Sequence, residues 1–176
     1  GYSVTALKDG RILIAGGTDG ANYQPVTRLY APETKTFMNN GTLIQARAWH
    51  TATLLNDGRV LIAGGVAPSG FQVDWGEVYD PASGIFQALP APSQFSSAHA
   101  GQMRAAHAEY GAPAGDAALL GNGQVLVIGG YDDIFGYGYG LADVFSPATN
   151  GCDLSNFTQW PPLEYLQTSN AQETYN

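Results

Sequence analysis

The chain has 176 residues, enough for one ordinary hydrophobic core, and 44 % of them are apolar, which excludes a disordered chain. Charged residues make up only 12 %, whereas glycine (23) and proline (10) are abundant, and this mixture favours a turn-rich β protein over a helical one. The formal net charge of −8 argues against binding to the phosphate backbone of a nucleic acid. It also argues against binding to or insertion into an anionic membrane.

The single cysteine, Cys152, excludes both an internal disulfide and a cysteine-based metal site. The sequence contains no apolar run that approaches the roughly 18 residues of a transmembrane helix. The chain begins at Gly1 with neither a methionine nor a signal peptide, which predicts a processed or incompletely known polypeptide.

The first predicted element is a β-hairpin. Residues 2–17 read YSVTALKDGRILIAGG, and Asp9-Gly10 separates two β-prone runs because Asp-Gly readily adopts the positive φ angles of a tight turn. Nearly the same letters return at 50–65, HTATLLNDGRVLIAGG, and a weaker copy stands at 115–130, GDAALLGNGQVLVIGG. The second run of each copy is apolar on both faces, so we expect a central strand buried on both sides. The glycine pair that ends each run allows φ > 0 or a close approach of two backbones.

Each copy continues in the same way beyond its glycine pair. In every copy an aromatic residue stands two positions before a proline. The residue seven positions after that aromatic is again aromatic in the first two copies and is a cysteine in the third. The pairs are Tyr30 and Phe37, Tyr79 and Phe86, and Phe145 and Cys152. We therefore predict a third strand, a proline-containing turn and a fourth strand in each copy. Four strands at a period near fifty residues are typical of one blade of a β-propeller.

These motifs resemble kelch repeats. The stretch from Arg47 to Gly65, with its R-x-x-H-T-A-T-L-L-x-D-G-x-V-L-I-A-G-G pattern, is similar to the kelch-like repeats of bacterial and secreted proteins, and such repeats also form the central domain of galactose oxidase. The resemblance covers residues 1–152 as three blades, at about 1–46, 47–103 and 104–152. It implies an all-β propeller of four-stranded antiparallel blades. The third copy departs most, because Cys152 replaces the aromatic residue.

Three blades cannot close a propeller ring, which typically takes 4 to 8. We therefore expect either a longer polypeptide or an assembly of copies through open blade edges, and the start at Gly1 favours the former. Residues 153–176 do not repeat, and they are either a linker or the beginning of a divergent blade.

The loops of such a meander predict where function lies. The turns between the first and second strands are short and similar in all copies, whereas the loops between the second and third strands differ, at 18–26, 66–75 and 131–142. Variable loops on a rigid frame are common binding sites. The aromatic rings of these loops can stack on a sugar or contact a protein, and their acidic groups can accept hydrogen bonds. Alternatively, the rings pack against the blades and have only a structural role. The candidate ligand-binding residues are Tyr23, Phe71, Trp75, Tyr131, Asp132, Asp133, Tyr137 and Tyr139.

The remaining polar residues favour structural roles. His50 and His107 occupy matching places where we expect structural hydrogen bonds, His99 lies in a crossing, and Arg47 and Arg104 are expected to pair with carbonyls or carboxylates. The Asp132-Asp133 pair lacks the spacing of a calcium loop. No metal or cofactor site is predicted.

The sequence therefore predicts a non-catalytic interaction module that binds a glycan or a protein and is extracellular or displayed at the cell surface. Two glycosylation sequons, at Asn40 and Asn156, are compatible with that location. The competing hypothesis is a fragment of a secreted copper oxidase that resembles galactose oxidase, whose active-site residues would lie outside this chain. A purely structural propeller is the third alternative.

Overall fold

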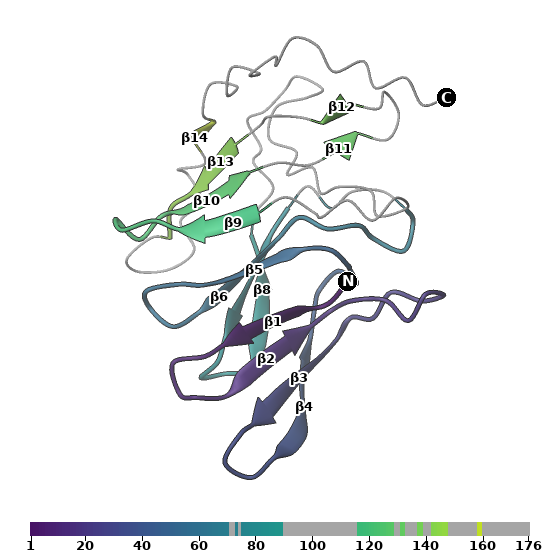
Figure 1. Ribbon diagram of the computed structural model, residues 1–176, viewed down its shortest axis with the longest axis vertical. Helices are drawn as coiled ribbons and strands as arrows, with labels where there is room; N and C mark the ends of the chain where they lie inside the picture. Colours follow the sequence, from purple (N-terminus) through teal and green to yellow (C-terminus); the bar gives the residue numbers. More distant parts are fainter. Residues whose placement is uncertain are drawn as a thin grey trace, which may run out of the picture.

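The computed structural model describes residues 1–70, 73, 75–89, 116–128, 131–132, 137–138, 142–147 and 158–159, and in this part of the chain all regular secondary structure is β-strand (Figure 1). The strands form antiparallel sheets of four strands and one two-stranded sheet, and none of these closes into a barrel. The prediction of an all-β protein with four-stranded antiparallel sheets is confirmed. None of the described segments is a helix long and apolar enough to cross a membrane.

Sheets I and II each correspond to one copy of the repeat, and sheet III combines three strands of the third copy with one strand from residues 153–176. Sheet I contains β1 (Ser3–Ala6), β2 (Ile12–Ala15), β3 (Val26–Ala31) and β4 (Thr36–Thr42). Sheet II contains β5 (Thr51–Leu54), β6 (Val60–Ala63), β7 (Glu77–Asp80) and β8 (Ile85–Ala88). Sheet III contains β9 (Asp116–Leu119), β10 (Val125–Ile128), β13 (Ala142–Phe145) and β14 (Thr158–Gln159). In each sheet, neighbours in sequence are neighbours in space.

The first turn of each sheet depends on one glycine and one side chain before it. Gly10 has φ 86° and its N–H donates to the Leu7 carbonyl at 3.1 Å, while the Leu7 N–H donates to the Arg11 carbonyl at 2.8 Å. Of the turn residues only Gly10 has a positive φ, so the turn is a type I turn with a bulge at the glycine. The sequence had suggested positive φ angles for both Asp9 and Gly10. Asp9 instead accepts the Arg11 N–H at 3.0 Å. The turns of sheets II and III repeat this arrangement with Asp57 and Asn122.

The glycine pairs allow the predicted close approach of backbones. Gly65 has φ 95°, and a Cβ atom there would lie 2.7 Å from the Ala48 carbonyl oxygen. The equivalent Gly17 donates its N–H to the Arg47 carbonyl at 2.9 Å, and Ala48 pairs with Val66. The segment that leads from sheet I into sheet II is therefore held against the glycine pairs of both sheets.

The three sheets stack in chain order, with sheet II between its neighbours (Figure 1). One apolar cluster joins sheets I and II, and includes Leu13, Leu29, Val60, Ile62, Tyr79 and Phe86. A second cluster joins sheets II and III, and includes Leu61, Ala63, Val78, Val125 and Phe145. Alternate residues of a strand point to opposite faces, so both faces of sheet II contribute to the core.

The expectation that the second strand of every copy is buried on both faces holds only for sheet II. All four residues of β6 are buried, whereas β2 alternates between buried Leu13 and Ala15 and half-buried Ile12 and Ile14. The reason is position in the stack, because no described element covers the outer face of sheet I. Nearly identical sequences therefore differ in burial through their neighbours alone.

The third copy differs from the other two after β13. The predicted fourth strand around Cys152 lies outside the described residues, and the strand that pairs with β13 is β14, with Val144 opposite Thr158. Between β10 and β13, the short strands β11 (Tyr131–Asp132) and β12 (Tyr137–Gly138) pair with each other.

Candidate functional site

The eight residues proposed from the variable loops have different structural settings. Tyr23 and Trp75 have described side chains, and both are half-buried. In the third loop, the backbones of Tyr131 and Asp132 pair with those of Gly138 and Tyr137, so this loop contains a small hairpin. The other three, Phe71, Asp133 and Tyr139, lie outside the described residues.

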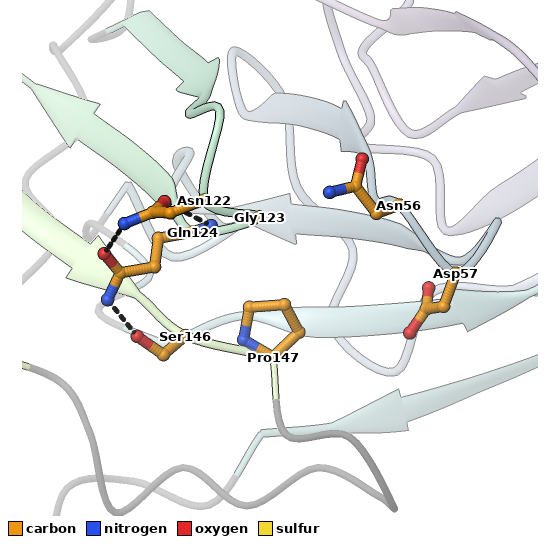
Figure 2. Close-up of a pocket in the computed structure, with 7 residues that line it drawn as sticks. All are labelled: Asn56, Asp57, Asn122, Gly123, Gln124, Ser146 and Pro147. Atoms are coloured by element: carbon orange, nitrogen blue, oxygen red, sulfur yellow. Dashed lines mark hydrogen bonds between the residues drawn. The ribbon is translucent and has the colours of Figure 1, made fainter.

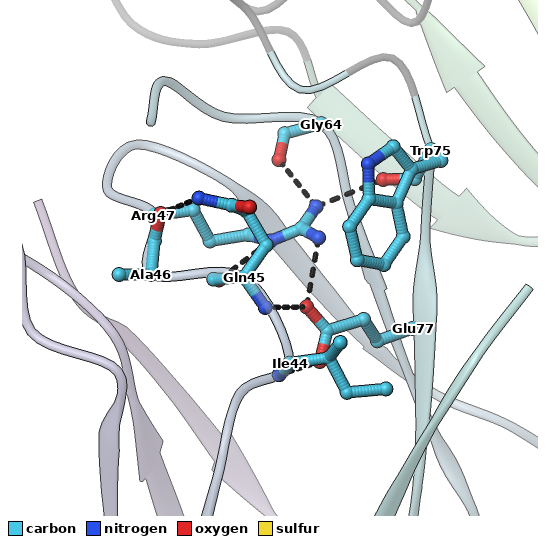
Figure 3. Close-up of polar contacts among 7 residues, drawn as sticks. All are labelled: Ile44, Gln45, Ala46, Arg47, Gly64, Trp75 and Glu77. Carbon is cyan, nitrogen blue, oxygen red and sulfur yellow. Dashed lines mark hydrogen bonds and ion pairs between the residues drawn. The ribbon is translucent and has the colours of Figure 1, made fainter. Parts of the chain in front are cut away.

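Trp75 takes part in a buried polar centre around Arg47 (Figure 3). The Arg47 guanidinium carbon lies 4.7 Å from the centroid of the Trp75 ring, in a cation–π arrangement. Arg47 Nη1 also donates to the Trp75 carbonyl at 2.8 Å and to the Gly64 carbonyl at 2.9 Å. The prediction that Arg47 pairs with carbonyls is confirmed, and the ring proposed for ligand binding is engaged in holding it.

Glu77 is the charged partner of Arg47. Arg47 Nη2 donates to Glu77 Oε1 at 2.8 Å, and both side chains are fully inaccessible to solvent. The same carboxylate accepts the backbone N–H groups of Ile44 at 2.7 Å and Gln45 at 3.1 Å. Burial lowers the pKa of Arg47, and the charge of Glu77 acts in the opposite direction. The centre thus ties the incoming segment 44–47 to strand β7 and the end of strand β6.

Tyr23 pairs with an aromatic residue that the sequence analysis did not single out. Its ring meets that of Trp49 edge to face, with centroids 5.8 Å apart and planes at 76°. Trp49 has φ 56°, unusual for a residue other than glycine, and its N–H donates to the Gly1 carbonyl at 2.8 Å. Both rings are half-buried, so they present an aromatic surface beside the first variable loop. The sequence signal that could have identified this aromatic residue was its place next to His50, at the start of the second repeat.

His50 has the structural role predicted for it. Its Nε2 lies 2.8 Å from the Ser3 hydroxyl oxygen, and Nδ1 has no hydrogen-bond partner in the described part of the chain. Burial, and then the positive charge of Arg47, lower the pKa of His50 to about 3, so the ring is neutral near pH 7. Among the described residues no group of three or more potential ligands could hold a metal ion. His99, His107 and Arg104 lie outside the described residues.

The sequon residue Asn40 lies near the end of β4, and its side-chain amide donates to the Thr27 hydroxyl at 3.2 Å. The Thr27 hydroxyl in turn donates to the Gly41 carbonyl at 2.5 Å. Asn40 is therefore half-buried and hydrogen-bonded within sheet I. The other sequon residue, Asn156, lies outside the described residues.

A polar cleft lies on the opposite side of the sheets, between the turns of sheets II and III (Figure 2). Its volume is about 700 Å³, and it is lined by Asn56, Asp57, Asn122, Gly123, Gln124, Ser146 and Pro147. Gln124 fixes one wall by donating to the Ser146 hydroxyl at 2.5 Å and accepting from the Asn122 amide at 2.5 Å. The sequence analysis did not predict this cleft, because it placed function in the variable loops and not at the short, similar turns.

One acidic group lies at the rim of the cleft. Burial raises the pKa of Asp57, but the hydrogen bonds and charge of Arg59 outweigh that effect and leave the pKa below its usual value. Asp57 is therefore ionised at neutral pH. The cleft offers amide and hydroxyl groups beside one carboxylate, a set that can hydrogen-bond a neutral polar ligand.

The matching junction between sheets I and II is bridged by long cationic side chains. Lys8 Nζ donates to the Asn56 carbonyl, and Arg11 Nη2 donates to the Pro81 carbonyl at 3.4 Å. One unit later, the position of Lys8 is taken by the shorter Asn56. A shorter side chain at this position contributes to the opening between sheets II and III.

No protein-family model and no curated protein matches the chain. Among solved structures, the chain is similar to the structure of YjhT, with a TM-score of 0.64 at 14 % sequence identity. The match covers 93 % of this chain and 52 % of that one, so the chain spans about half the length of the structure it resembles. At this identity the likeness concerns the fold alone.

Proposed function

We propose that the chain is part of a kelch-type β-propeller that works as a non-catalytic interaction module, extracellular or at the cell surface, and binds a glycan or a protein through its variable loops. The repeat motifs and the three stacked four-stranded sheets support the propeller assignment. A ring of such sheets would place the variable loops together on one side.

The observation that carries the proposal is the pair formed by Tyr23 and Trp49. The two rings are half-buried beside the first variable loop, and the backbone N–H groups of Ala48 and Trp49 both donate hydrogen bonds. Fixed aromatic rings bind sugars by stacking and anchor protein partners at little cost in side-chain entropy. Trp75 is less suited to direct binding because its ring and carbonyl hold Arg47.

The test is a binding screen of the purified chain on a glycan array, followed by affinity purification of protein partners. We expect Tyr23→Ala to weaken the ligand found by about tenfold or more, with an unchanged circular dichroism spectrum. Gln124→Ala, in the cleft on the other side, is the matched control and should leave the affinity unchanged. The reverse result would move the site to the cleft, and absence of any glycan or protein ligand would contradict the proposal.

The copper-oxidase alternative has no supporting observation among the described residues. His50, the one histidine with a described side chain, is buried, neutral and engaged with Ser3. Copper uptake and a tyrosyl-radical absorption band in the full-length protein would favour that alternative over the binding module.

A further inference from the structure

Three asparagines of the chain precede a glycine, at Asn40, Asn122 and Asn150. In an Asn-Gly pair the backbone nitrogen of the glycine can attack the side-chain amide carbon of the asparagine, and the glycine offers no side chain that hinders the approach. In a folded protein the rate depends on whether the backbone at the pair can leave its native conformation. Asn150 lies outside the described residues, so the structure distinguishes between Asn40 and Asn122.

Asn122 lies at the tip of the hairpin formed by β9 and β10, where it lines the cleft between sheets II and III (Figure 2). It is exposed and stands between two glycines, and no described residue other than the chain neighbours lies within 4 Å of a Cβ position at Gly121. Gly123 has φ 87°, and its N–H donates to the Leu120 carbonyl at 2.9 Å. Opening such an exposed turn costs little free energy, because few contacts are lost.

The side chain of Asn122 is held in a way that assists an attack from the following residue. Its Oδ1 accepts the Gln124 N–H at 3.0 Å, so the side-chain amide is folded toward the backbone that follows it. The same N–H faces the oxygen on which negative charge develops when the amide carbon is attacked. The Nδ2 of Asn122 donates to Gln124 Oε1 at 2.5 Å, which holds the amide in this orientation. Such positioning of two reacting groups favours an intramolecular reaction.

Asn40 also precedes a glycine, but it lies within β4 and is half-buried. A Cβ atom at Gly41 would lie 2.5 Å from the Gly84 carbonyl oxygen, so this part of β4 is packed against sheet II. The Gly41 carbonyl also accepts the hydroxyl of Thr27, whose side chain is buried. Movement of this backbone requires sheets I and II to separate, so reaction at Asn40 requires an opening close to global unfolding.

A further sheet beside sheet III would leave the turn of Asn122 accessible. Asp9 and Asp57 occupy the equivalent positions in sheets I and II, and each of these sheets is followed by another sheet. The side chains of Asp9 and Asp57 are nevertheless 44 % and 43 % exposed. The tip of this hairpin is therefore open to water wherever its sheet stands in the stack (Figure 1).

We propose that Asn122 is a site of spontaneous deamidation, which adds a second carboxylate to the cleft between sheets II and III. The Gly123 nitrogen forms a bond to the side-chain amide carbon of Asn122 and loses its proton, and the bond from that carbon to Nδ2 breaks, so that ammonia leaves and a cyclic imide forms. Water then hydrolyses one of the two imide C–N bonds. Cleavage at the side-chain carbonyl gives aspartate, and cleavage at the backbone carbonyl gives isoaspartate. Water is the only co-reactant.

The two products affect the turn differently. Asp9 and Asp57 each accept the N–H of the second residue that follows, at 3.0 Å in both turns, so conversion of Asn122 to aspartate preserves the turn. Isoaspartate adds a methylene group to the backbone and disrupts the hydrogen bonds between Leu120 and Gln124. Both products make the wall opposite Asp57 anionic, so the cleft then favours a cationic group over a neutral ligand. The inference does not depend on the function proposed above, because the reaction needs no ligand.

The first test is peptide mapping by mass spectrometry after incubation of the folded chain at mildly alkaline pH, where the attacking nitrogen loses its proton more readily. A parallel sample in urea gives the rate of each Asn-Gly pair in the unfolded chain. In the folded chain we expect Asn122 to react within about tenfold of its unfolded rate, and Asn40 to be slowed by about a hundredfold or more. A protease that cleaves after leucine and aromatic residues separates Asn122 from Asn150, because Leu126 and Phe145 lie between them. Equal folded-state rates at Asn122 and Asn40 would overturn the proposal.

A transplanted pair tests whether the turn is the cause. Asp57→Asn places an Asn-Gly pair in the equivalent turn of sheet II with almost no change in side-chain size, and this pair should react within about fivefold of the rate of Asn122. Asn122→Gln is the control, because its longer side chain must close a larger ring and should remain unmodified over the same time. An unreactive pair in Asp57→Asn would overturn the assignment of the reaction to this turn geometry. Circular dichroism of each variant verifies that the fold is retained.

Discussion

Sheets I and II have nearly the same first hairpin and occupy different environments. Ile14 and Ile62 are equivalent residues of the second strand, yet Ile62 is fully buried and Ile14 is half-buried. Arg28 and Glu77 are equivalent residues of the third strand, yet Arg28 is exposed and Glu77 lies in a buried ion pair. A repeat sequence therefore specifies strands and turns locally, while its neighbours in the stack determine what each residue contributes to stability.

The largest expected effect comes from the buried ion pair of sheet II. Glu77→Ala should lower the free energy of unfolding by about 3–5 kcal/mol, because it leaves the Arg47 charge buried without its partner. Arg28→Ala, at the equivalent exposed position of sheet I, should change it by less than about 0.5 kcal/mol. Urea denaturation of both variants measures the difference.

A double variant provides the control for that prediction. Arg47→Met combined with Glu77→Leu removes both charges together and should recover part of the lost stability, because no unpaired charge then remains buried. Recovery is incomplete because the N–H groups of Ile44 and Gln45 still lack the carboxylate that accepts them. A Glu77→Ala cost near that of Arg28→Ala would contradict the structural role assigned to the pair.

The second comparison concerns the apolar residues of the second strands. Ile62→Ala should cost about 3 kcal/mol, because it removes buried methyl groups and leaves a cavity between two sheets. Ile14→Ala should cost about 1 kcal/mol, because one side of Ile14 is open and little cavity remains. Equal costs for the two variants would contradict the difference in burial.

These comparisons also indicate what the sequence could predict. The hairpins, the glycine pairs and the kind of partner that Arg47 finds, carbonyls and a carboxylate, follow from local turn chemistry and from the repeat, so they could be predicted. The half-burial of β2, the cleft between sheets II and III and the engagement of Trp75 with Arg47 depend on how successive units pack, and one unit read alone does not contain that information. Of the proposed ligand-binding residues, Tyr23 remains at a half-exposed aromatic surface, and its partner Trp49 became apparent only from the spatial arrangement.

The smallest of the three expected effects is a dependence on pH that arises from His50 in sheet II. The same position in sheet I is Tyr2, which is exposed. The pKa of His50 is about 3 in the folded chain and about 6.5 when the group is unperturbed. Between these values the unfolded chain binds a proton that the folded chain does not, so stability falls as the pH decreases, by about 1.4 kcal/mol per unit. From pH 7 to about pH 4.5 the loss should reach about 2–3 kcal/mol.

His50→Gln isolates this contribution, because glutamine retains an amide that can hydrogen-bond to the Ser3 hydroxyl and does not titrate. The carboxylates whose pKa values are lowered by hydrogen bonds, such as Asp9 with Arg11, also lose stabilisation in acid, but they do so equally in both proteins. The difference between the two denaturation series should therefore be nearly constant above pH 7 and grow steadily below about pH 6.5. Parallel series down to pH 4.5 would mean that His50 accepts a proton in the folded chain, which would require that its ring is accessible to water and not enclosed between the two sheets.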